Sequence, residues 1–461
     1  MAALPDFLHG GEAARLIPVV ADTNREQRTA SVVLAALRGV YEFRQTMLGS
    51  LGVRVGKRAA LSAWTEICFN NKESGTNGKT RHERPDGLLV LDTGKKRWTA
   101  LVEAKVGNAC IGEEQITDYV RQAKASGVDA VITISNQFVA QPSHYPVKLP
   151  KNLTRGIHLY HWSWMYVLTQ ATLLLEDDAI ASDDQRFLLE EVVRHLSHDS
   201  SGISRFDSMN SEWKDLVGKV KSGANLTKGS EEVENTVSSW HQEQRDLCLI
   251  MSRRLARPVK LKLSRQHRTD PPKRLQDDCE QLVKQRALTC LLDVPNAAAD
   301  ITVTADLTTR TIVTSMRLTA PRDRKSTKAR ANWLARQLSK ANADDIYIKA
   351  VRRGRAEDTQ APLADVLNDA TVLESTGTNV PPAAFEVFQM LDLAGKFSGR
   401  KVFIEHLETG VPRFYEQVGQ RLRAWVEPPP KINERDPVSE DADVTHHEDD
   451  VPEPRDPTVG Q

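Results

Sequence analysis

Hydrophobic residues in the first hundred positions follow the periods of helices and strands in turn. Apolar positions in 24–47 recur every three or four residues, which predicts one long amphipathic helix. Residues 60–69 alternate between two faces and predict a strand. Two apolar runs, 88–91 and 98–102, flank turn-forming residues at 93–96, so we expect a β-hairpin there.

The segments around this hairpin predict the rest of an α/β domain. Residues 1–24 show no clear period and are expected to be irregular, whereas 112–126 predicts a helix. Strands are predicted at 129–135 and 156–161, and a helix at 162–175. A helical crossover should place the strand at 129–135 parallel to the second hairpin strand. We therefore expect a mixed sheet flanked by helices, in the order α-β-β-β-α-β with a β-α extension.

The middle of the chain shows helical patterns. A stripe in 185–196 predicts a helix that packs on the first domain. Residues 231–255 predict one long helix with apolar positions three, four or seven apart. This helix either packs within its own domain or forms a dimeric coiled coil, and the interrupted heptad pattern favours the first interpretation.

Alternating residues then predict a small α+β domain. Segments 301–305 and 311–318 form a second expected hairpin, which is followed by a basic helix at 325–341 and a strand at 345–351. The remaining predicted elements are helices at 363–373, 381–393 and 411–425, and a short strand at 401–405.

These patterns divide the chain into four parts. We expect a first domain with a helical extension at 1–222, a linker at 223–230, and an accessory α+β domain at 231–426. Residues 427–461 contain eleven acidic and three basic residues and almost no large apolar residue, which predicts a disordered acidic tail. The tail either only solubilises the protein or competes with nucleic acid for a basic surface.

Composition indicates a globular protein. The 461 residues are 40% hydrophobic and 27% charged, with no net charge. No apolar run approaches the roughly 20 residues that span a bilayer, and the N-terminus lacks the pattern of a secretory signal. The five cysteines are scattered without zinc-site spacing, which is typical of a reducing compartment. We therefore expect a cytoplasmic protein.

The first hairpin carries the strongest candidate chemistry. Its register places Asp86 opposite Glu103, with Cβ atoms about 4.5–5.5 Å apart, which is unfavourable without a cation. Lys105 follows Glu103 by two residues and therefore points to the same face. Carboxylates suit Mg²⁺ or Mn²⁺, and the Ala104 carbonyl could add a ligand.

Pro85-Asp86 followed by Glu103-Ala104-Lys105 resembles the motif of the PD-(D/E)XK nuclease superfamily, whose core has the same order of helices and strands. Gln115 and Tyr119 match the Q-x-x-x-Y element of its RecB-like members. The resemblance covers roughly residues 10–170. It implies a restriction-endonuclease-like fold and metal-dependent hydrolysis of phosphodiester bonds, with a place in bacterial defence or genome maintenance.

A further acid often joins such sites, and two residues are candidates. Glu26 opens the first predicted helix, where it could instead serve as a favourable charge at a helix start. Glu66 lies on the strand at 60–69, where it could instead be a surface residue. Tyr119 is either a site residue or a core aromatic, and His82 is interpreted as an ordinary loop histidine.

Residues 251–287 contain eleven basic and four acidic residues. Such an excess fits contact with a phosphate backbone, although solvated helix faces explain many similar runs. The residues predicted to bind nucleic acid are Arg253, Arg254, Arg257, Lys260, Lys262 and Arg265.

The sequence thus predicts a metal-dependent nuclease that acts on DNA, with RNA as an alternative substrate. The accessory domain is expected to bind nucleic acid, a partner protein or a second copy of the chain. The alternative from another class is a nuclease fold that binds nucleic acid or assembles with little hydrolysis.

Overall fold

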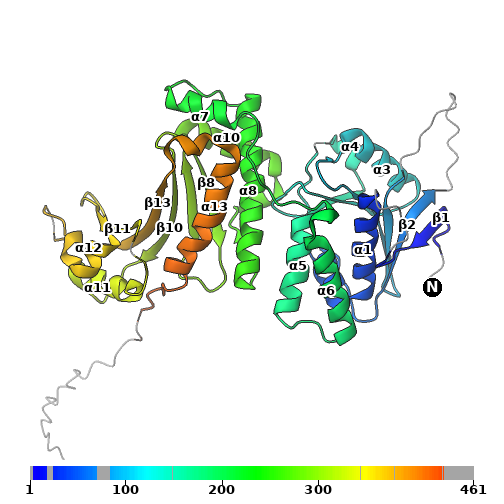
Figure 1. Cartoon of the computed structure of the whole chain (residues 1–461), viewed down its shortest axis with the longest axis horizontal. Coiled ribbons are helices and arrows are strands. Elements are labelled where there is room, and N and C mark those ends of the chain that lie inside the picture. The colour runs from blue at the N-terminus through cyan, green and yellow to red at the C-terminus, as the bar shows by residue number, and fades with distance from the viewer. Residues whose placement is uncertain are drawn as a thin grey trace, which may run out of the picture. The chain divides into compact units, whose positions relative to one another are not determined.

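The computed structural model describes residues 4–17, 24–69 and 84–429, apart from 148, 343, 378 and 428 (Figure 1). The described residues up to Trp425 form one compact unit. Two regions of the predictions fall outside the described residues, namely the loop at 70–83 with His82 and the acidic tail from 430 onward. Within the described ranges, no helix is long and apolar enough to cross a membrane.

The first part of the chain folds around a six-stranded mixed sheet. Its strands lie in chain order: β1 (Leu8–Ala13), β2 (Ala60–Phe69), β3 (Gly87–Asp92), β4 (Arg97–Ala104), β5 (Ala130–Ser135) and β6 (His158–Ser163). The first four strands pair antiparallel, and β4, β5 and β6 pair parallel. The hairpin register is confirmed, because Gly87 pairs with Val102 and Asp92 with Arg97.

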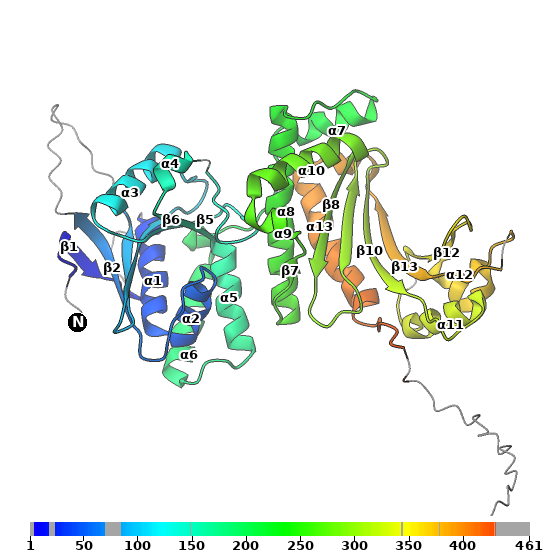
Figure 2. The ribbon, with the colours of Figure 1, turned by 180° about the vertical axis from the view of Figure 1, so that it is seen from behind.

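Helices cover both faces of this sheet (Figures 1 and 2). They are α1 (Arg25–Gly39), α2 (Tyr41–Gly49), α3 (Glu113–Ala125), α4 (Lys151–Thr154), α5 (Trp164–Glu176) and α6 (Asp183–Ser197). Leu89 and Leu91 of β3 share a core with α1, α2, α5 and α6, whereas Leu88 and Val90 share one with α3. Both faces of β3 are therefore buried, which explains why its sequence is apolar from Leu88 to Leu91.

Two predictions in this region are wrong. The helix expected at 24–47 is two helices, because Val40 has an extended backbone with φ −110° and ψ 112°. The segment expected to be irregular contains β1, which lies at the edge of the sheet beside β2. Its sequence, Leu-His-Gly-Gly-Glu-Ala, has little alternation, and two register irregularities interrupt its pairing with β2.

A second, seven-stranded sheet forms the later part of the chain. Its strands are β7 (Lys260–Leu261), β8 (Ala287–Asp293), β9 (Ile301–Asp306), β10 (Thr311–Thr319), β11 (Ile346–Val351), β12 (Thr359–Pro362) and β13 (Ala384–Asp392). Their order in the sheet is β12-β11-β13-β10-β9-β8-β7. All six neighbouring pairs are antiparallel. The hairpin, helix and strand predicted between 301 and 351 are present.

The helices of this later part are α7 (Trp213–Lys221), α8 (Glu231–Leu255), α9 (Arg265–Thr269), α10 (Pro271–Gln285), α11 (Thr327–Leu338), α12 (Leu363–Asn368) and α13 (Arg400–Phe414). Short 3₁₀ turns occupy 199–201, 370–373 and 394–398. Trp213 of α7, Trp240 of α8 and Phe403 of α13 are buried in the core of the second sheet. The apolar residues of α8 are thus covered within its own chain, and the predicted linker lies between two helices of this core.

Three predicted elements near the end of the second sheet are wrong. Residues 381–393 contain β13 rather than a helix, because Phe385 and Val387 alternate into the core while the strand pairs between β10 and β11. Residues 401–405 belong to α13 rather than to a strand. The closing helix ends at Phe414, and a π-helical turn occupies 415–419.

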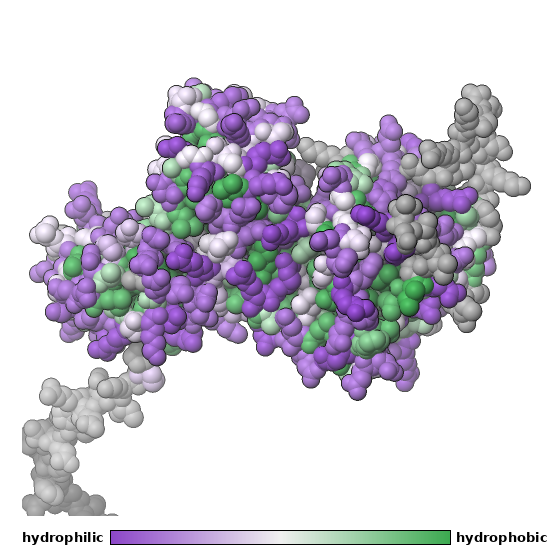
Figure 3. Space-filling view, in the orientation of Figure 1, coloured by the Kyte–Doolittle hydropathy of each residue, from purple (hydrophilic) through white to green (hydrophobic). Residues whose placement is uncertain are grey.

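The face of the molecule in Figure 3 is mostly hydrophilic with scattered apolar areas.

Candidate active site

Residues from four separate segments meet at the end of β4. Asp86 directly precedes β3, Glu103 is near the end of β4, and Lys105 follows that strand. Glu26 lies in the first turn of α1, and Gln115 in the first turn of α3. Because β4, β5 and β6 are parallel, their carboxyl ends lie at the same end of the sheet, and the cluster lies at this end.

Asp86 is held by a hydrogen bond from the residue at the end of the opposite hairpin strand. The Ala104 N–H donates a hydrogen bond of 2.7 Å to Asp86 Oδ2. The next residue, Gly87, packs so closely that a Cβ there would lie 2.4 Å from Leu34 Cδ1 and 2.8 Å from the Trp64 carbonyl oxygen. A glycine at this position therefore allows α1 to approach β3.

Glu103 is buried and accepts hydrogen bonds at both carboxylate oxygens. Its Oε1 accepts from Lys105 Nζ at 2.8 Å and from Gln115 Nε2 at 2.8 Å. Its Oε2 accepts from the Tyr119 hydroxyl at 2.8 Å. Gln115 Nε2 also lies 3.1 Å from the Tyr119 hydroxyl. Gln115 and Tyr119 are four residues apart on α3, so one helix face supplies both donors.

The structure brings Glu26 to the cluster. Its Oε2 lies 3.3 Å from Lys105 Nζ, and its Oε1 accepts from the Val106 N–H at 3.5 Å. Lys105 therefore lies between the carboxylates of Glu26 and Glu103. Its carbonyl accepts a hydrogen bond of 2.8 Å from the buried Trp164 indole at the start of α5.

Glu66 lies elsewhere. It is an exposed residue of β2 with φ +53°, at the irregular pairing between β2 and β1. A bulge of this kind turns a side chain away from the regular alternation of the strand. Of the two candidate acids, only Glu26 contacts Lys105 in the structure.

Burial and like charge shift the titration of the acids. Burial, followed by repulsion from Glu103, raises the pKa of Asp86 to about 8. Burial also raises the pKa of Glu103 and, with Glu103 nearby, that of Tyr119. Burial alone lowers the pKa of Lys105, but the hydrogen bond and charge of Glu103 outweigh it and raise that pKa. Lys105 is therefore charged at neutral pH.

The donor set matches a hard divalent cation in chemistry, since Asp86, Glu103 and Glu26 all supply carboxylate oxygens. Among the described residues, however, no group of three or more His, Cys, Asp or Glu is arranged to hold a metal ion. The oxygens of Glu103 are occupied by Lys105, Gln115 and Tyr119. Ion binding at Glu103 would thus exchange some of these donors for the cation.

The sequence did not reveal how the loop after β4 is supported. Gly202 follows the turn at 199–201, and its carbonyl oxygen accepts a hydrogen bond of 2.7 Å from the Gly107 N–H. Gly202 has φ +75°, and a Cβ there would lie 3.1 Å from Val106 Cβ. Asn136, just after β5, donates to the Gly107 and Gly202 carbonyls, each at 2.9 Å. These contacts join segments far apart in sequence, so no local pattern signals them.

The predicted nucleic-acid-binding residues have different environments. Arg253 is partly buried and donates to Thr169 Oγ1 at 2.7 Å. Arg257 pairs with Asp177, and Lys262 with Asp300, each at 2.5 Å. The side chains of Arg254, Lys260 and Arg265 are exposed. Part of the basic excess is thus engaged in ion pairs or hydrogen bonds within the protein.

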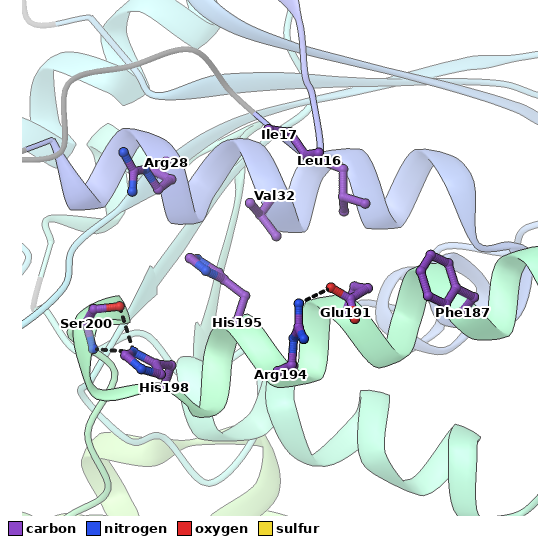
Figure 4. A pocket seen from close by; sticks show the side chains of 10 residues that line it. All are labelled: Leu16, Ile17, Arg28, Val32, Phe187, Glu191, Arg194, His195, His198 and Ser200. Atoms are coloured by element: carbon purple, nitrogen blue, oxygen red, sulfur yellow. Dashed lines mark hydrogen bonds and ion pairs between the residues drawn. The ribbon is translucent and has the colours of Figure 1, made fainter.

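A pocket of about 850 Å³ lies between α1 and α6 (Figure 4). It is lined by apolar residues, among them Val32 and the exposed Phe187, and by the basic side chains of Arg28, Arg194 and His195. Arg194 is paired with Glu191 at 2.6 Å. None of the clustered residues around Glu103 lines this pocket.

Comparison with known proteins gives no family assignment, since no protein-family model and no curated protein matches the chain. The interpretation of the site therefore depends on its geometry.

Proposed function

We propose that the chain is a metal-dependent nuclease with a restriction-endonuclease-like core in its first part. The convergence of Glu26, Asp86, Glu103 and Lys105 at the carboxyl edge of a mixed sheet supports this function best. Three acids and a cation concentrated in a partly buried site are costly to maintain unless a ligand uses them. The order of elements and the Q-x-x-x-Y residues on α3 agree with the same proposal.

The roles follow from the contacts. Asp86 and Glu103, with the Ala104 carbonyl, would hold Mg²⁺ or Mn²⁺, which supplies an activated water and polarises the phosphate when bound. Lys105 carries a positive charge and lies beside Glu26 and Glu103, so it can donate to a phosphate oxygen or to the attacking water. Gln115 can orient the same water, and Tyr119 fixes the carboxylate of Glu103. Glu26 positions Lys105.

One observation favours a second candidate function, a module that binds nucleic acid with little hydrolysis. Glu103 is fully hydrogen-bonded by Lys105, Gln115 and Tyr119, and this network satisfies the carboxylate without an ion. A site of this kind could persist as a structural network in a fold that only binds.

Purified protein incubated with plasmid, linear duplex, single-stranded DNA or RNA separates the candidates. The nuclease proposal expects cleavage in Mg²⁺ or Mn²⁺ that EDTA abolishes, with DNA as the preferred substrate. Binding of these nucleic acids without any cleavage in either metal would favour the second candidate.

A further inference from the structure

Two adjoining cavities form a cleft where the first sheet's loops meet the segment that leads into the second sheet. Their volumes are about 670 and 520 Å³, and Gln141, Ser143 and Arg268 line both. One wall comes from the loop after β5 and from α5. The other comes from α8 and from the segment around β7 and α9. We call this feature the basic cleft.

The basic cleft is strongly positive. Of the described residues, five that line it are Arg or Lys, namely Arg245, Lys260, Lys262, Arg265 and Arg268, and one is acidic, Asp293. Lys262 is paired with Asp300, whereas Arg265, Arg268 and Lys260 are exposed. A concave surface with one sign of charge concentrates counter-ions of the opposite sign. The charge therefore suits an anionic ligand with several phosphates.

The cleft also provides a flat surface for stacking. The Arg245 guanidinium lies over the Tyr166 ring, 5.1 Å from its centroid, and both residues line the cleft. Nucleobases stack on arginine planes and on aromatic rings in proteins that bind single strands. Gln141, Gln170 and Ser143 add hydrogen-bonding groups to the same lining.

A hydrogen bond from His144 joins the two walls of the cleft. His144 is buried, and its imidazole Nε2–H donates to the Arg268 carbonyl at 2.8 Å. Burial lowers the pKa of His144, so the ring remains neutral. This hydrogen bond joins the loop after β5 to α9, which carries Arg265 and Arg268. The backbone that carries Arg268 is thus tied to the opposite wall of the cleft.

The cleft lies at the carboxyl ends of the parallel strands of the first sheet, as does the candidate active site. The loop that lines it begins after the carboxyl end of β5, and α5, with Tyr166 in its first turn, begins after the carboxyl end of β6. The same segments contact the end of β4, because Asn136 donates to Gly107 and Trp164 to the Lys105 carbonyl. A nucleic-acid strand bound in the cleft could therefore continue toward Glu103 and Lys105.

We propose that the basic cleft binds a single-stranded segment of the nucleic-acid substrate, with phosphates on Arg265, Arg268 and Lys260 and a base on the Arg245–Tyr166 stack. The volumes are those of ordinary small-ligand pockets, roughly 300–1,000 Å³, which accommodate a few nucleotides rather than the body of a duplex. The proposal rests on the nuclease function in giving this strand the role of substrate. It assigns the second part of the chain to substrate binding.

Fluorescence anisotropy with a labelled single-stranded oligonucleotide in EDTA tests the cleft without cleavage. The double variant Arg265→Ala/Arg268→Ala should weaken binding at least about tenfold, and the slope of log affinity against log salt should fall by about 1.4, since each lost phosphate contact contributes about 0.7. The control Lys214→Ala/Lys221→Ala removes the same charge from exposed positions on α7 and should bind nearly as wild type. The lysine-for-arginine double variant should recover most of the affinity.

Two outcomes would refute single-strand binding at the cleft. One is equal weakening in the cleft and α7 variants, and the other is a blunt-ended duplex that binds more tightly than the single strand with the same dependence on Arg265 and Arg268. Cleavage assays keep this result separate from the nuclease proposal. Binding that depends on the cleft residues, without metal-dependent cleavage, would refute the nuclease function but support the cleft as a binding site. Wild-type cleavage efficiency in the Arg265→Ala/Arg268→Ala variant would support the nuclease function but refute the role of the cleft in binding substrate.

Discussion

Replacement of Asp246 by Asn should make the protein less sensitive to alkaline pH. Asp246 of α8 is fully buried, as is Glu243, and Glu408 of α13 is nearly so. Asp246 Oδ2 accepts from the Phe206 N–H at 2.8 Å. Burial raises its pKa to about 7, although this hydrogen bond and the charge of Arg253 partly oppose the shift. An asparagine oxygen can accept the same hydrogen bond without carrying charge.

The sign follows from proton linkage. The folded protein holds a proton on Asp246 up to about pH 7, whereas the unfolded chain releases it near pH 4. Protonation therefore favours the folded state at low pH, and stability falls as pH rises from about 4 through the folded pKa. A rise of the pKa from about 4 to about 7 on folding corresponds to ~4 kcal/mol in total, of which roughly 2.5 kcal/mol is lost between pH 5 and pH 8.

Urea unfolding followed by circular dichroism at pH 5 and pH 8 measures this loss. The free energy of unfolding of Asp246→Asn, relative to that of wild type, should increase by roughly 2.5 kcal/mol from pH 5 to pH 8. The control Asp215→Asn changes an exposed acid on α7 and should track wild type. A difference in unfolding free energy between variant and wild type that is the same at both pH values, or that favours the variant more at pH 5, would show that Asp246 does not have a raised pKa in the folded protein.

Three further predictions concern the candidate active site. Gly87→Ala should lower the free energy of unfolding by about 1–3 kcal/mol, because its Cβ would clash with Leu34 and a backbone carbonyl; an unchanged urea midpoint would contradict this packing. Glu26→Gln should reduce metal-dependent cleavage at least about tenfold by removing a charge beside Lys105; wild-type rates in single-turnover assays would exclude the assigned role. Tyr119→Phe should reduce cleavage by roughly 10- to 100-fold with the fold intact, since it removes one hydrogen bond to buried Glu103; equal losses in activity and stability would indicate a purely structural role.

Local patterns predicted the elements that are close in sequence. The hairpin register follows from two apolar runs and a turn, and it correctly placed Asp86 near Glu103. The first sheet was predicted well because each strand pairs with its neighbour in the chain. β13 was mistaken for a helix because its place between β10 and β11 is decided by pairing with distant strands.

The same distinction applies to the site. The spacing of Glu103 and Lys105 on a strand, and of Gln115 and Tyr119 on a helix, showed which side chains share a face. The choice between Glu26 and Glu66 depended on where α1 packs and on a bulge in β2, neither of which is a local pattern. The support of Gly107 by Gly202 and Asn136 likewise appears only in three dimensions.

The proposed active site is tested most directly by comparing Asp86→Asn with Glu66→Gln in single-turnover cleavage of the preferred nucleic acid in Mg²⁺. Both changes replace an acid by its amide, but only Asp86 lies in the cluster. We expect Asp86→Asn to lose at least about 100-fold in rate, or about 2.7 kcal/mol of barrier, whereas Glu66→Gln retains the wild-type rate. Cleavage that survives in Asp86→Asn, with the same metal dependence, would show that Asp86 does not hold the catalytic metal.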